Sequence, residues 1–308
     1  PMRLAVPDLV SSSYFPVLAA AELGLFAQEG VDVELQQVYP VTSAAIALRD
    51  GEIDFLVGPA HAPLKAFPDW AGVKLLAAVA QHIYWLLVVR CDLDVAPGDL
   101  AGLHDLRIAA ARGPEQALRQ LFAEAHVSLD DNRITIGPPP ASEGQDTSFG
   151  LSAAAALRDG RIDAFWANAM AAEIAVNDGA GRVFLDPRRG QGPARARSFT
   201  FAAAMATDAV IAEHPRQVAA LVRGIVGAQQ ALKEDPQRAA AVGRRLFPAA
   251  EAGFITDLVR RDLPFYDAKI SHEAVDGLNG FARRAGMCSA EVSYDDVVAQ
   301  GLDTRGDC

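Results

Sequence analysis

The sequence predicts an α/β protein made of two similar lobes, and three observations support this. Short apolar runs rich in Val and Ile alternate with Ala-rich helical segments, which is typical of largely parallel sheets. The chain has 308 residues, which at roughly 100 to 200 residues per domain favours two domains. An octapeptide also recurs in the second third of the chain.

The repeat is the most specific internal feature. Residues 47–54 read Ala-Leu-Arg-Asp-Gly-Glu-Ile-Asp, and residues 156–163 match them at seven of eight positions, at an offset of 109. A chance likeness is the alternative, because many Ala-rich helices end at a Gly before a strand. Identity across a helix, a turn and a strand favours a duplicated α/β half, with a period too long for a solenoid.

The first lobe begins as a strand, helix and strand unit. The helix stops near Gly30, and the strand after it alternates apolar with polar residues. Thr42 and Ser43 offer N-cap hydroxyls to a helix that stops at Gly51. The expected strands are residues 4–7, 31–38, 53–57, 73–80 and 84–90, and the expected helices are residues 15–28, 42–49 and 61–67.

The second lobe repeats the alternation, and a helical tail follows it. Its expected strands are residues 106–110, 134–136, 162–167 and 183–185, and its expected helices are residues 114–126 and 151–158. A polar loop at 190–198 leads to a strand at 200–205 and to helices at 215–234, 236–246, 249–258 and 271–285. No further strand-rich half follows, so we expect the tail to pack on the first lobe.

Charge and composition exclude several classes of protein. The net charge of -11 argues against a duplex nucleic acid partner and disfavours an anionic membrane surface. No run approaches the roughly 20 apolar residues that span a bilayer, so we expect a soluble protein. Cys91, Cys288 and Cys308 are too widely spaced for a disulfide framework or a CxxC metal site.

Several segments resemble the substrate-binding proteins of ABC importers, in particular the nitrate, sulfonate, taurine and thiamine-precursor type. They are residues 7–16, 20–26, which read Ala-Ala-Glu-Leu-Gly-Leu-Phe, 29–33, which read Glu-Gly-Val-Asp-Val, and 47–58 with its second copy at 156–166. The resemblance covers most of residues 3–247 in order.

This resemblance implies a type II periplasmic-binding-protein fold, in which two lobes are joined by two crossings and close on a ligand between them. The crossings would be residues 88–92 and 197–201. Lobe one would then be discontinuous, made of residues 1–91 and 199–308, and lobe two would be residues 92–198.

Ligands of open α/β sheets bind beyond the carboxyl ends of the strands, so the loops that follow the strands hold the candidates. Hydroxyls and unpaired amides at helix starts suit an anion, although simple N-capping is the alternative. Tyr84 and Trp85 would point to opposite faces if extended, which would leave one of them in the core. The candidates in the first lobe are Ser11, Ser12, Ser13, Tyr14, Thr42, Ser43, Pro59, Ala60, His61, His82 and Trp85.

The second lobe offers a similar set of loops. Gly113 and Pro114 follow a strand, beside Arg112, and open a helix, while Trp166 and Asn168 could close over a planar ligand. A core Trp and capping side chains are the competing interpretations. The candidates together are rich in hydroxyls and aromatic rings, which favours a small, singly charged or planar polar ligand.

The leading interpretation is a monomeric solute-binding protein that captures a sulfonate, nitrate, pyrimidine or carboxylate in an interlobe cleft and delivers it to an ABC permease. We expect no cofactor and no metal, because GxGxxG, P-loop, HExxH and GxSxG motifs are lacking. The protein would be periplasmic or cell-surface if a signal peptide was removed, and cytoplasmic otherwise.

Two alternatives remain open. One is a cytoplasmic enzyme on the same fold, decarboxylase-like or pyrimidine-synthase-like, in which His61 or His82 would act as the general acid or base. The other is a ligand sensor that reports to a regulator. Asp54 and Asp163 stand at equivalent strand starts, so we expect structural roles for them rather than paired catalytic acids.

Overall fold

The computed structural model of the protein describes residues 1–140 and 148–302, so Cys308 lies outside the described residues. The chain divides into two compact units: unit 1 is Pro1–His82 with Thr200–Cys308, and unit 2 is Ile83–Phe199. The chain thus enters unit 2 nine residues before the expected boundary at 91/92. The reason is that β5 (Leu86–Arg90) pairs with two strands of unit 2.

Unit 1 is built on a mixed five-stranded sheet in the order β2-β1-β3-β10-β4. Strand β1 is parallel to both β2 and β3, whereas β10 is antiparallel to β3 and β4. The antiparallel strand is the one that the chain enters on its return from unit 2. The strands are β1 (Met2–Val6), β2 (Val33–Gln37), β3 (Phe55–Pro59), β4 (Val73–Ala80) and β10 (Ala202–Thr207).

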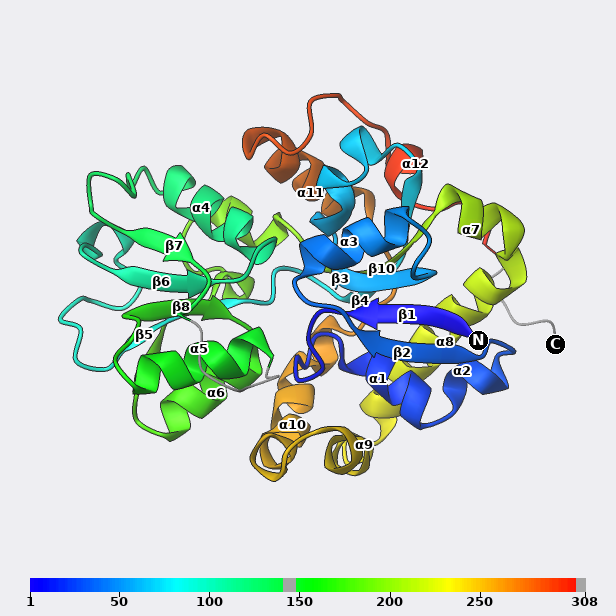
Figure 1. The fold of residues 1–308 in the computed structure, drawn as a ribbon, viewed down its shortest axis with the longest axis horizontal. Helices are drawn as coiled ribbons and strands as arrows, with labels where there is room; N and C mark the ends of the chain where they lie inside the picture. The colour runs from blue at the N-terminus through cyan, green and yellow to red at the C-terminus, as the bar shows by residue number, and fades with distance from the viewer. Residues whose placement is uncertain (141–147, 303–308) are drawn as a thin grey trace. The chain divides into compact units, whose positions relative to one another are not determined.

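Helices cover both faces of this sheet (Figure 1). One face carries α1 (Phe15–Glu22), α2 (Leu25–Gln28) and α8 (Pro215–Glu234), which pack on one another. The other carries α3 (Val41–Arg49) and α11 (His272–Arg284), whose apolar side chains share a core with the sheet. The remaining helices are α7 (Asp208–Glu213), α9 (Arg238–Leu246), α10 (Ala249–Asp262) and α12 (Tyr294–Val297), with short 3-10 turns at Ala62–Lys65, Pro68–Trp70 and Leu263–Phe265.

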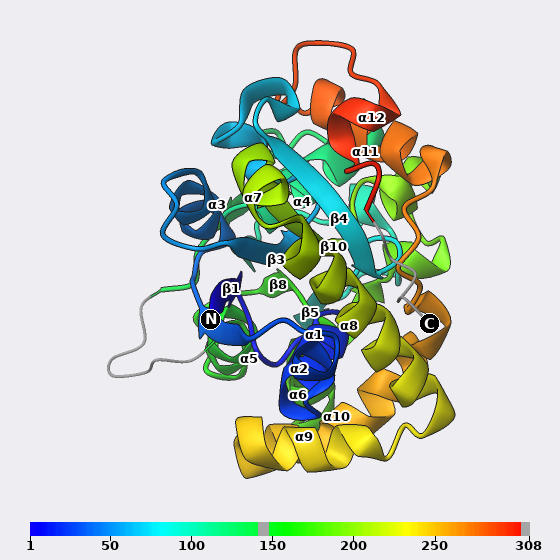
Figure 2. The same ribbon diagram turned by 90° about the vertical axis from the view of Figure 1, so that its right-hand side faces the viewer.

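The helical tail packs on unit 1, as the sequence predicted. Helix α8 runs beside β4 (Figure 2), where the Gln229 side chain donates to the carbonyls of Ala78 and Val79 at 3.1 and 3.0 Å. After α11, the tail contacts Asp69, which accepts hydrogen bonds from the backbone of Ser289 and from the Cys288 thiol. The thiol and the backbone amides lower the pKa of Asp69 to about 2, so a charged carboxylate anchors the end of the tail.

Unit 2 has its own mixed sheet, in the order β7-β6-β8-β5-β9. One face is covered by α4 (Pro114–Glu124), and the other by α5 (Phe149–Arg158) and α6 (Ala169–Asn177) (Figure 1). The strands besides β5 are β6 (Arg107–Ala110), β7 (Thr135–Gly137), β8 (Ala164–Ala167) and β9 (Gly181–Leu185). The expected loop at 190–198 ends in a 3-10 turn, Ala194–Ser198, and two others lie at Leu100–Gly102 and Pro187–Arg189.

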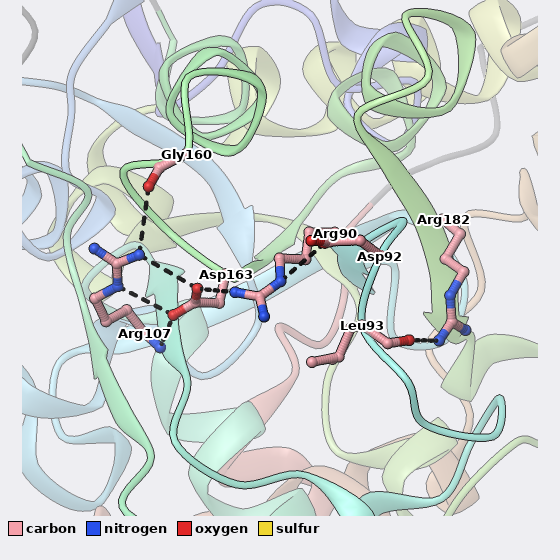
Figure 3. Close-up of polar contacts among 7 residues, drawn as sticks. All are labelled: Arg90, Asp92, Leu93, Arg107, Gly160, Asp163 and Arg182. Atoms are coloured by element: carbon pink, nitrogen blue, oxygen red, sulfur yellow. Dashed lines mark hydrogen bonds and ion pairs between the residues drawn. The ribbon is translucent and has the colours of Figure 1, made fainter.

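The repeated octapeptide adopts the same structure in both units. Each copy ends a helix, turns at a glycine with positive φ, 74° at Gly51 and 72° at Gly160, and leads through an aspartate into a strand. The carboxylate of Asp54 accepts from the backbone and guanidinium of Arg3, and that of Asp163 accepts in the same way from Arg107 (Figure 3). Both aspartates therefore have structural roles, as expected.

The model also bears on membrane insertion. Over residues 1–140 and 148–302, no helix combines the length and the apolar character that crossing a bilayer requires.

Candidate functional site

The turn after β1 is buried and is held by hydrogen bonds from its own side chains. Ser11, Ser12 and Ser13 expose no more than 3% of their surface. The hydroxyls of Ser12 and Ser13 donate to Oδ2 of Asp262 at 2.8 and 3.3 Å, while Tyr14 occupies the N-cap position of α1. The hydroxyls of Ser12 and Ser13 thus hold a distant carboxylate rather than capping the helix.

A segment from the tail covers this turn. We call residues 262–269 the strap. The hydroxyl of Tyr266, which is fully buried, donates to the Ser12 carbonyl at 2.6 Å. At the end of β4, the Gln81 side chain donates to the carbonyls of Asp267 and Lys269 at 2.8 and 2.7 Å. The strap therefore joins the carboxyl ends of β1 and β4.

Sequence reasoning missed Asp262 and Tyr266. Their partners lie about 250 positions away in the chain, and no local pattern indicates such a pairing. The one available signal was Pro264 followed by two aromatic residues, which interrupts the helical tail. Helix α10 ends at Asp262, four residues beyond its expected end at 258, and so places Asp262 beside the turn.

The loop after β3 places His61 inside the protein. Pro59, Ala60 and His61 are all buried, and the His61 ring is only 1% exposed. Its Nδ1 lies 3.1 Å from the Thr200 hydroxyl, and the ring meets Phe281 edge-on at a centroid distance of 5.2 Å. His61 is therefore a buried residue and not a surface histidine.

The predicted N-caps of α3 are also wrong. The helix begins at Val41 with Pro40 as N-cap, and no side chain caps it. The amide of Ser43 donates to the Pro40 carbonyl at 2.9 Å, so Thr42 and Ser43 lie within the first turn. Thr42 is half-buried and Ser43 is exposed, and no described contact joins either of them to the Ser12 turn.

The residues between β4 and β5 do not form the expected extended strand. His82 adopts a positive φ of 63° and meets the Phe265 ring edge-on at 6.2 Å. Strand β5 begins at Leu86 rather than at residue 84. Tyr84 and Trp85 are both buried with ring centroids 4.7 Å apart, so the expectation of opposite faces is wrong, because both residues lie before the start of β5.

In unit 2 the structure brings four of the predicted residues together. The ring centroids of Trp85 and Trp166 lie 6.0 Å apart, and the indole N–H of Trp166 donates to the Pro114 carbonyl at 3.1 Å. Gly113, with φ of 105°, is the N-cap residue of α4. Trp166 is fully buried at the carboxyl ends of β6 and β8. It therefore packs as a core residue, which was the competing interpretation.

Asn168 has a capping role. Its side-chain oxygen accepts from the Ala171 amide at 3.0 Å at the start of α6, and the residue is 7% exposed. Gly150 packs against it so closely that a Cβ there would lie 3.1 Å from the Asn168 amide nitrogen. The Asn168 side chain is therefore fixed by its surroundings.

The charged groups near the unit 2 cluster are acidic as well as basic. Burial raises the pKa of Glu115, although hydrogen bonds from its own amide and that of Gly113 oppose the shift. Arg112, on the preceding loop, is exposed. Among the described residues, no group of three or more His, Cys, Asp or Glu side chains comes together as a metal site would require.

Unit 2 also has an open hollow elsewhere, with a volume of about 770 Å³. It lies between α4 and the edge strand β7, and its lining includes Arg119, His126, Asp130 and Ile136. None of the sequence-predicted site residues lines it.

Polar and aromatic clusters lie at the carboxyl ends of the strands in both units. Proteins with open α/β sheets bind their ligands at these ends, so the fold is of a ligand-binding class. A family model described as NMT1/THI5 like matches residues 11–239, which is most of the chain. The chain therefore belongs to the NMT1/THI5-like family. No curated protein matches it significantly.

Solved structures show the same fold. The ligand-binding component of an ABC-type import system from Staphylococcus aureus, with zinc bound, is 12% identical, with a TM-score of 0.71 over 99% of this chain and 100% of that one. The periplasmic aliphatic sulphonate binding protein SsuA from Escherichia coli is 16% identical, with a TM-score of 0.70 over 100% and 94%. The desulfurization enzyme DSZB is 16% identical, with a TM-score of 0.66 over 97% and 96%. These likenesses confirm the predicted periplasmic-binding-protein fold.

Proposed function

We propose that this protein is a solute-binding protein, which captures a small anionic or heterocyclic molecule and delivers it to an ABC permease. Binding would use the carboxyl ends of the strands in each unit, where the Ser12 turn and the Trp166 cluster lie. The protein would act as a monomer in the periplasm or at the cell surface, without covalent chemistry.

The observation that carries this proposal is that the family match and the fold similarity agree. The family match covers both units, and the similar structures include an import component and a sulphonate-binding protein along nearly their whole lengths. The site chemistry is compatible with capture. Buried hydroxyl, amide and indole groups are fixed by neighbours, and such preorganisation favours binding because little order is lost when a ligand arrives.

An enzyme on this fold is the second candidate, because DSZB shares the architecture. His61 is the side chain to test, since its ring nitrogen lies 3.1 Å from the Thr200 hydroxyl. A histidine bonded to a hydroxyl is the arrangement that activates a nucleophile in many enzymes. Edge-on packing on Phe281 gives the ring a structural role as well.

A thermal-shift screen of sulfonates, nitrate, pyrimidines and aromatic carboxylates tests the proposal. If the protein binds solutes, one class of compound should raise its melting temperature and should be recovered unchanged. His61→Asn serves as the discriminating variant. Loss of turnover with retained binding would establish the enzyme, and consumption of a compound by the wild type would overturn the solute-binding proposal.

A further inference from the structure

One arginine of unit 2 is buried at the edge of the sheet where open α/β folds bind ligands. Strands β8 and β9 are both antiparallel to β5, and β6 is parallel to β8, so the carboxyl ends of β6, β8 and β9 meet where β5 begins. Arg188 follows the end of β9, in the 3-10 turn Pro187–Arg189, and exposes 9% of its surface. Arginine is rarely buried to this extent.

The loop that carries Arg188 returns to the aromatic cluster of the same unit. The Arg197 side chain donates through Nε to the Arg188 carbonyl at 2.9 Å, and the Arg197 carbonyl accepts from the Ile83 amide at 3.1 Å. Ile83 lies two residues before Trp85, whose ring centroid is 6.0 Å from that of Trp166. The backbone of Arg188 is thus tied to the segment that bears Trp85.

Exposed residues flank Arg188, so it lies just beneath the surface of this edge. Arg189 and Gly190 follow it in the chain and are exposed, and Arg197, which contacts its carbonyl, is exposed as well. The Arg189 side chain is 72% exposed and pairs with Asp186 at 3.4 Å. Two adjacent arginines therefore differ in their surroundings, because one is buried and the other lies at the surface.

Positive charge predominates among the described loops and helix starts of this edge, which are residues 83–85, 111–117, 138–140, 168–172 and 186–199. These residues include two carboxyl groups, those of Glu115 and Asp186, and five arginines. The arginines are Arg112, Arg188, Arg189, Arg195 and Arg197. Since the chain as a whole has a net charge of -11, this excess is local, and it favours an anion at this edge.

The guanidinium group of Arg188 has the chemistry to hold an oxyanion. It stays charged at physiological pH and presents its N–H donors in a planar fork that matches two oxygens of one group. Charge-assisted hydrogen bonds of this kind are about twice as strong as neutral ones. A charge away from bulk water also acts more strongly on a nearby ion than a charge at the surface does.

We propose that Arg188 is a ligand-binding residue of unit 2, which selects a molecule bearing an oxyanion, such as a carboxylate or a sulfonate, over a neutral molecule of the same shape. This inference rests on the proposed solute-binding function. It narrows the ligand to a molecule with at least two oxygens on one charged group, and it assigns the recognition of that group to a loop that residue patterns did not single out.

Matched pairs of probes test the charge preference in the wild-type protein. The pairs are benzoate with benzamide, benzenesulfonate with benzenesulfonamide, and acetate with acetamide, each titrated by calorimetry into the full chain at neutral pH and low ionic strength. We expect the anion of at least one pair to bind about tenfold more tightly than its neutral partner, because hydrogen bonds to charged groups are the stronger ones. Tighter binding of the neutral members, or no preference for the anion in any pair, would overturn the inference.

Variants at two adjacent positions assign the preference to one side chain. Arg188→Gln removes the charge, so the members of the preferred pair should then bind within about twofold of each other. Arg188→Lys keeps the charge but not the fork, and should retain a reduced preference for the anion. Arg189→Gln, the same change at the exposed neighbour, should stay within about twofold of the wild type. A preference that survives Arg188→Gln unchanged would contradict the role of Arg188.

Melting temperatures separate a binding role from a structural one. An apolar side chain of similar volume in place of a buried charge is often neutral or stabilising. Arg188→Met should therefore melt no lower than the wild type without a probe, and it should lose the rise in melting temperature that the preferred anion gives to the wild type. Lower melting temperatures in all Arg188 variants, with both members of a pair weakened equally, would show a structural role and overturn the inference.

The proposed function fails in a different way. A preference for neutral probes would contradict the role of Arg188 and leave solute capture intact. Conversion of a bound probe to product would instead contradict solute capture, whichever member of a pair bound more tightly.

Discussion

The amino-terminal ends of the two sheets carry the same arginine–aspartate contact, and its surroundings differ. In unit 1, Arg3 donates to Asp54 and, through Nη2, to the Gly51 carbonyl at 2.9 Å. In unit 2, Arg107 donates to Asp163, and Nη2 lies 3.4 Å from the Gly160 carbonyl. Each contact joins neighbouring parallel strands where the repeated helix, turn and strand element ends.

Unit 2 adds a second arginine to this contact. Arg90, at the end of β5, places Nη1 2.6 Å from Asp163 Oδ1 and also pairs with Asp92 (Figure 3). The Asp163 side chain is 7% exposed, against 19% for Asp54. The more deeply buried carboxylate has the extra cation, which is what the cost of burying a charge requires.

The carboxyl ends of the sheets are unlike each other. Unit 1 has the serine turn with Asp262 and Tyr266, whereas unit 2 has two tryptophans and a capping asparagine. The amino-terminal ends of the two sheets, which share the arginine–aspartate contact, therefore stabilise the fold. The carboxyl ends, which differ, hold the candidate ligand contacts. This difference can be tested by matched substitutions in the two units.

The largest expected effect separates the two aspartates. Asp163→Ala leaves Arg107 without its carboxylate and Arg90 with Asp92 alone, and should lower the free energy of unfolding by about 3 kcal/mol, whereas Asp54→Ala removes a more exposed pair and should cost about half of that. Urea unfolding followed by tryptophan fluorescence measures both, because Trp70 lies in unit 1 and Trp85 and Trp166 lie in unit 2. Equal losses would show that Arg90 adds nothing.

Acid should weaken the same contact. Burial of Asp163 opposes its ionisation, but hydrogen bonds from the Arg107 side chain and backbone outweigh burial and lower its pKa. The stabilisation is therefore complete above the unfolded pKa of about 3.9 and is lost as the pH falls through the lower folded pKa.

Unfolding curves recorded between pH 5 and pH 2 check this sign. Asp163→Asn should be less stable than the wild type at pH 5 and should show a smaller further loss on acidification. A variant with the same pH slope as the wild type would contradict the assignment.

Removing the extra arginine should make unit 2 resemble unit 1. Arg90→Met keeps the aliphatic stem and removes the charge, which should cost about 1 kcal/mol because the Arg90 side chain is 40% exposed. The Asp163→Ala and Arg90→Met effects should be less than additive, because both remove the same contact. Simple additivity in the double variant would show that Arg90 acts elsewhere.

An effect of similar size concerns the strap. Tyr266→Phe removes one hydroxyl and leaves the Ser12 carbonyl without that donor, which should cost about 1 kcal/mol. The loss should appear as a lower midpoint of urea unfolding. A matched Trp166→Phe variant, which removes the indole donor to Pro114, should instead perturb unit 2.

Local patterns were sufficient to predict most of the fold. The repeat located both copies of the helix, turn and strand element, and glycines marked the helix ends at Gly51 and Gly160. The boundary between the units was misplaced by nine residues because an apolar run such as Leu86–Arg90 does not indicate which sheet it joins. Pairing is a tertiary property that composition does not encode.

The candidate site was only partly predictable. The serine turn, His61 and Trp166 were predicted as candidates from their places near strand ends, and so were the Trp85 and Pro114 partners of Trp166, but the partners of the serine turn and of His61 were not. Asp262 and Thr200 come from distant segments, and only the folded chain shows that the Ser12 hydroxyl is already donating. The expectation of hydroxyl donors for an anion came from residue type alone, whereas the folded chain shows that the Ser12 and Ser13 hydroxyls donate to Asp262.

Native mass spectrometry of the purified full chain, followed by release of whatever is bound, tests the central claim most directly. The expected result is one small molecule per chain, recovered with the same mass after prolonged incubation. Recovery of a chemically altered molecule would contradict the solute-binding function.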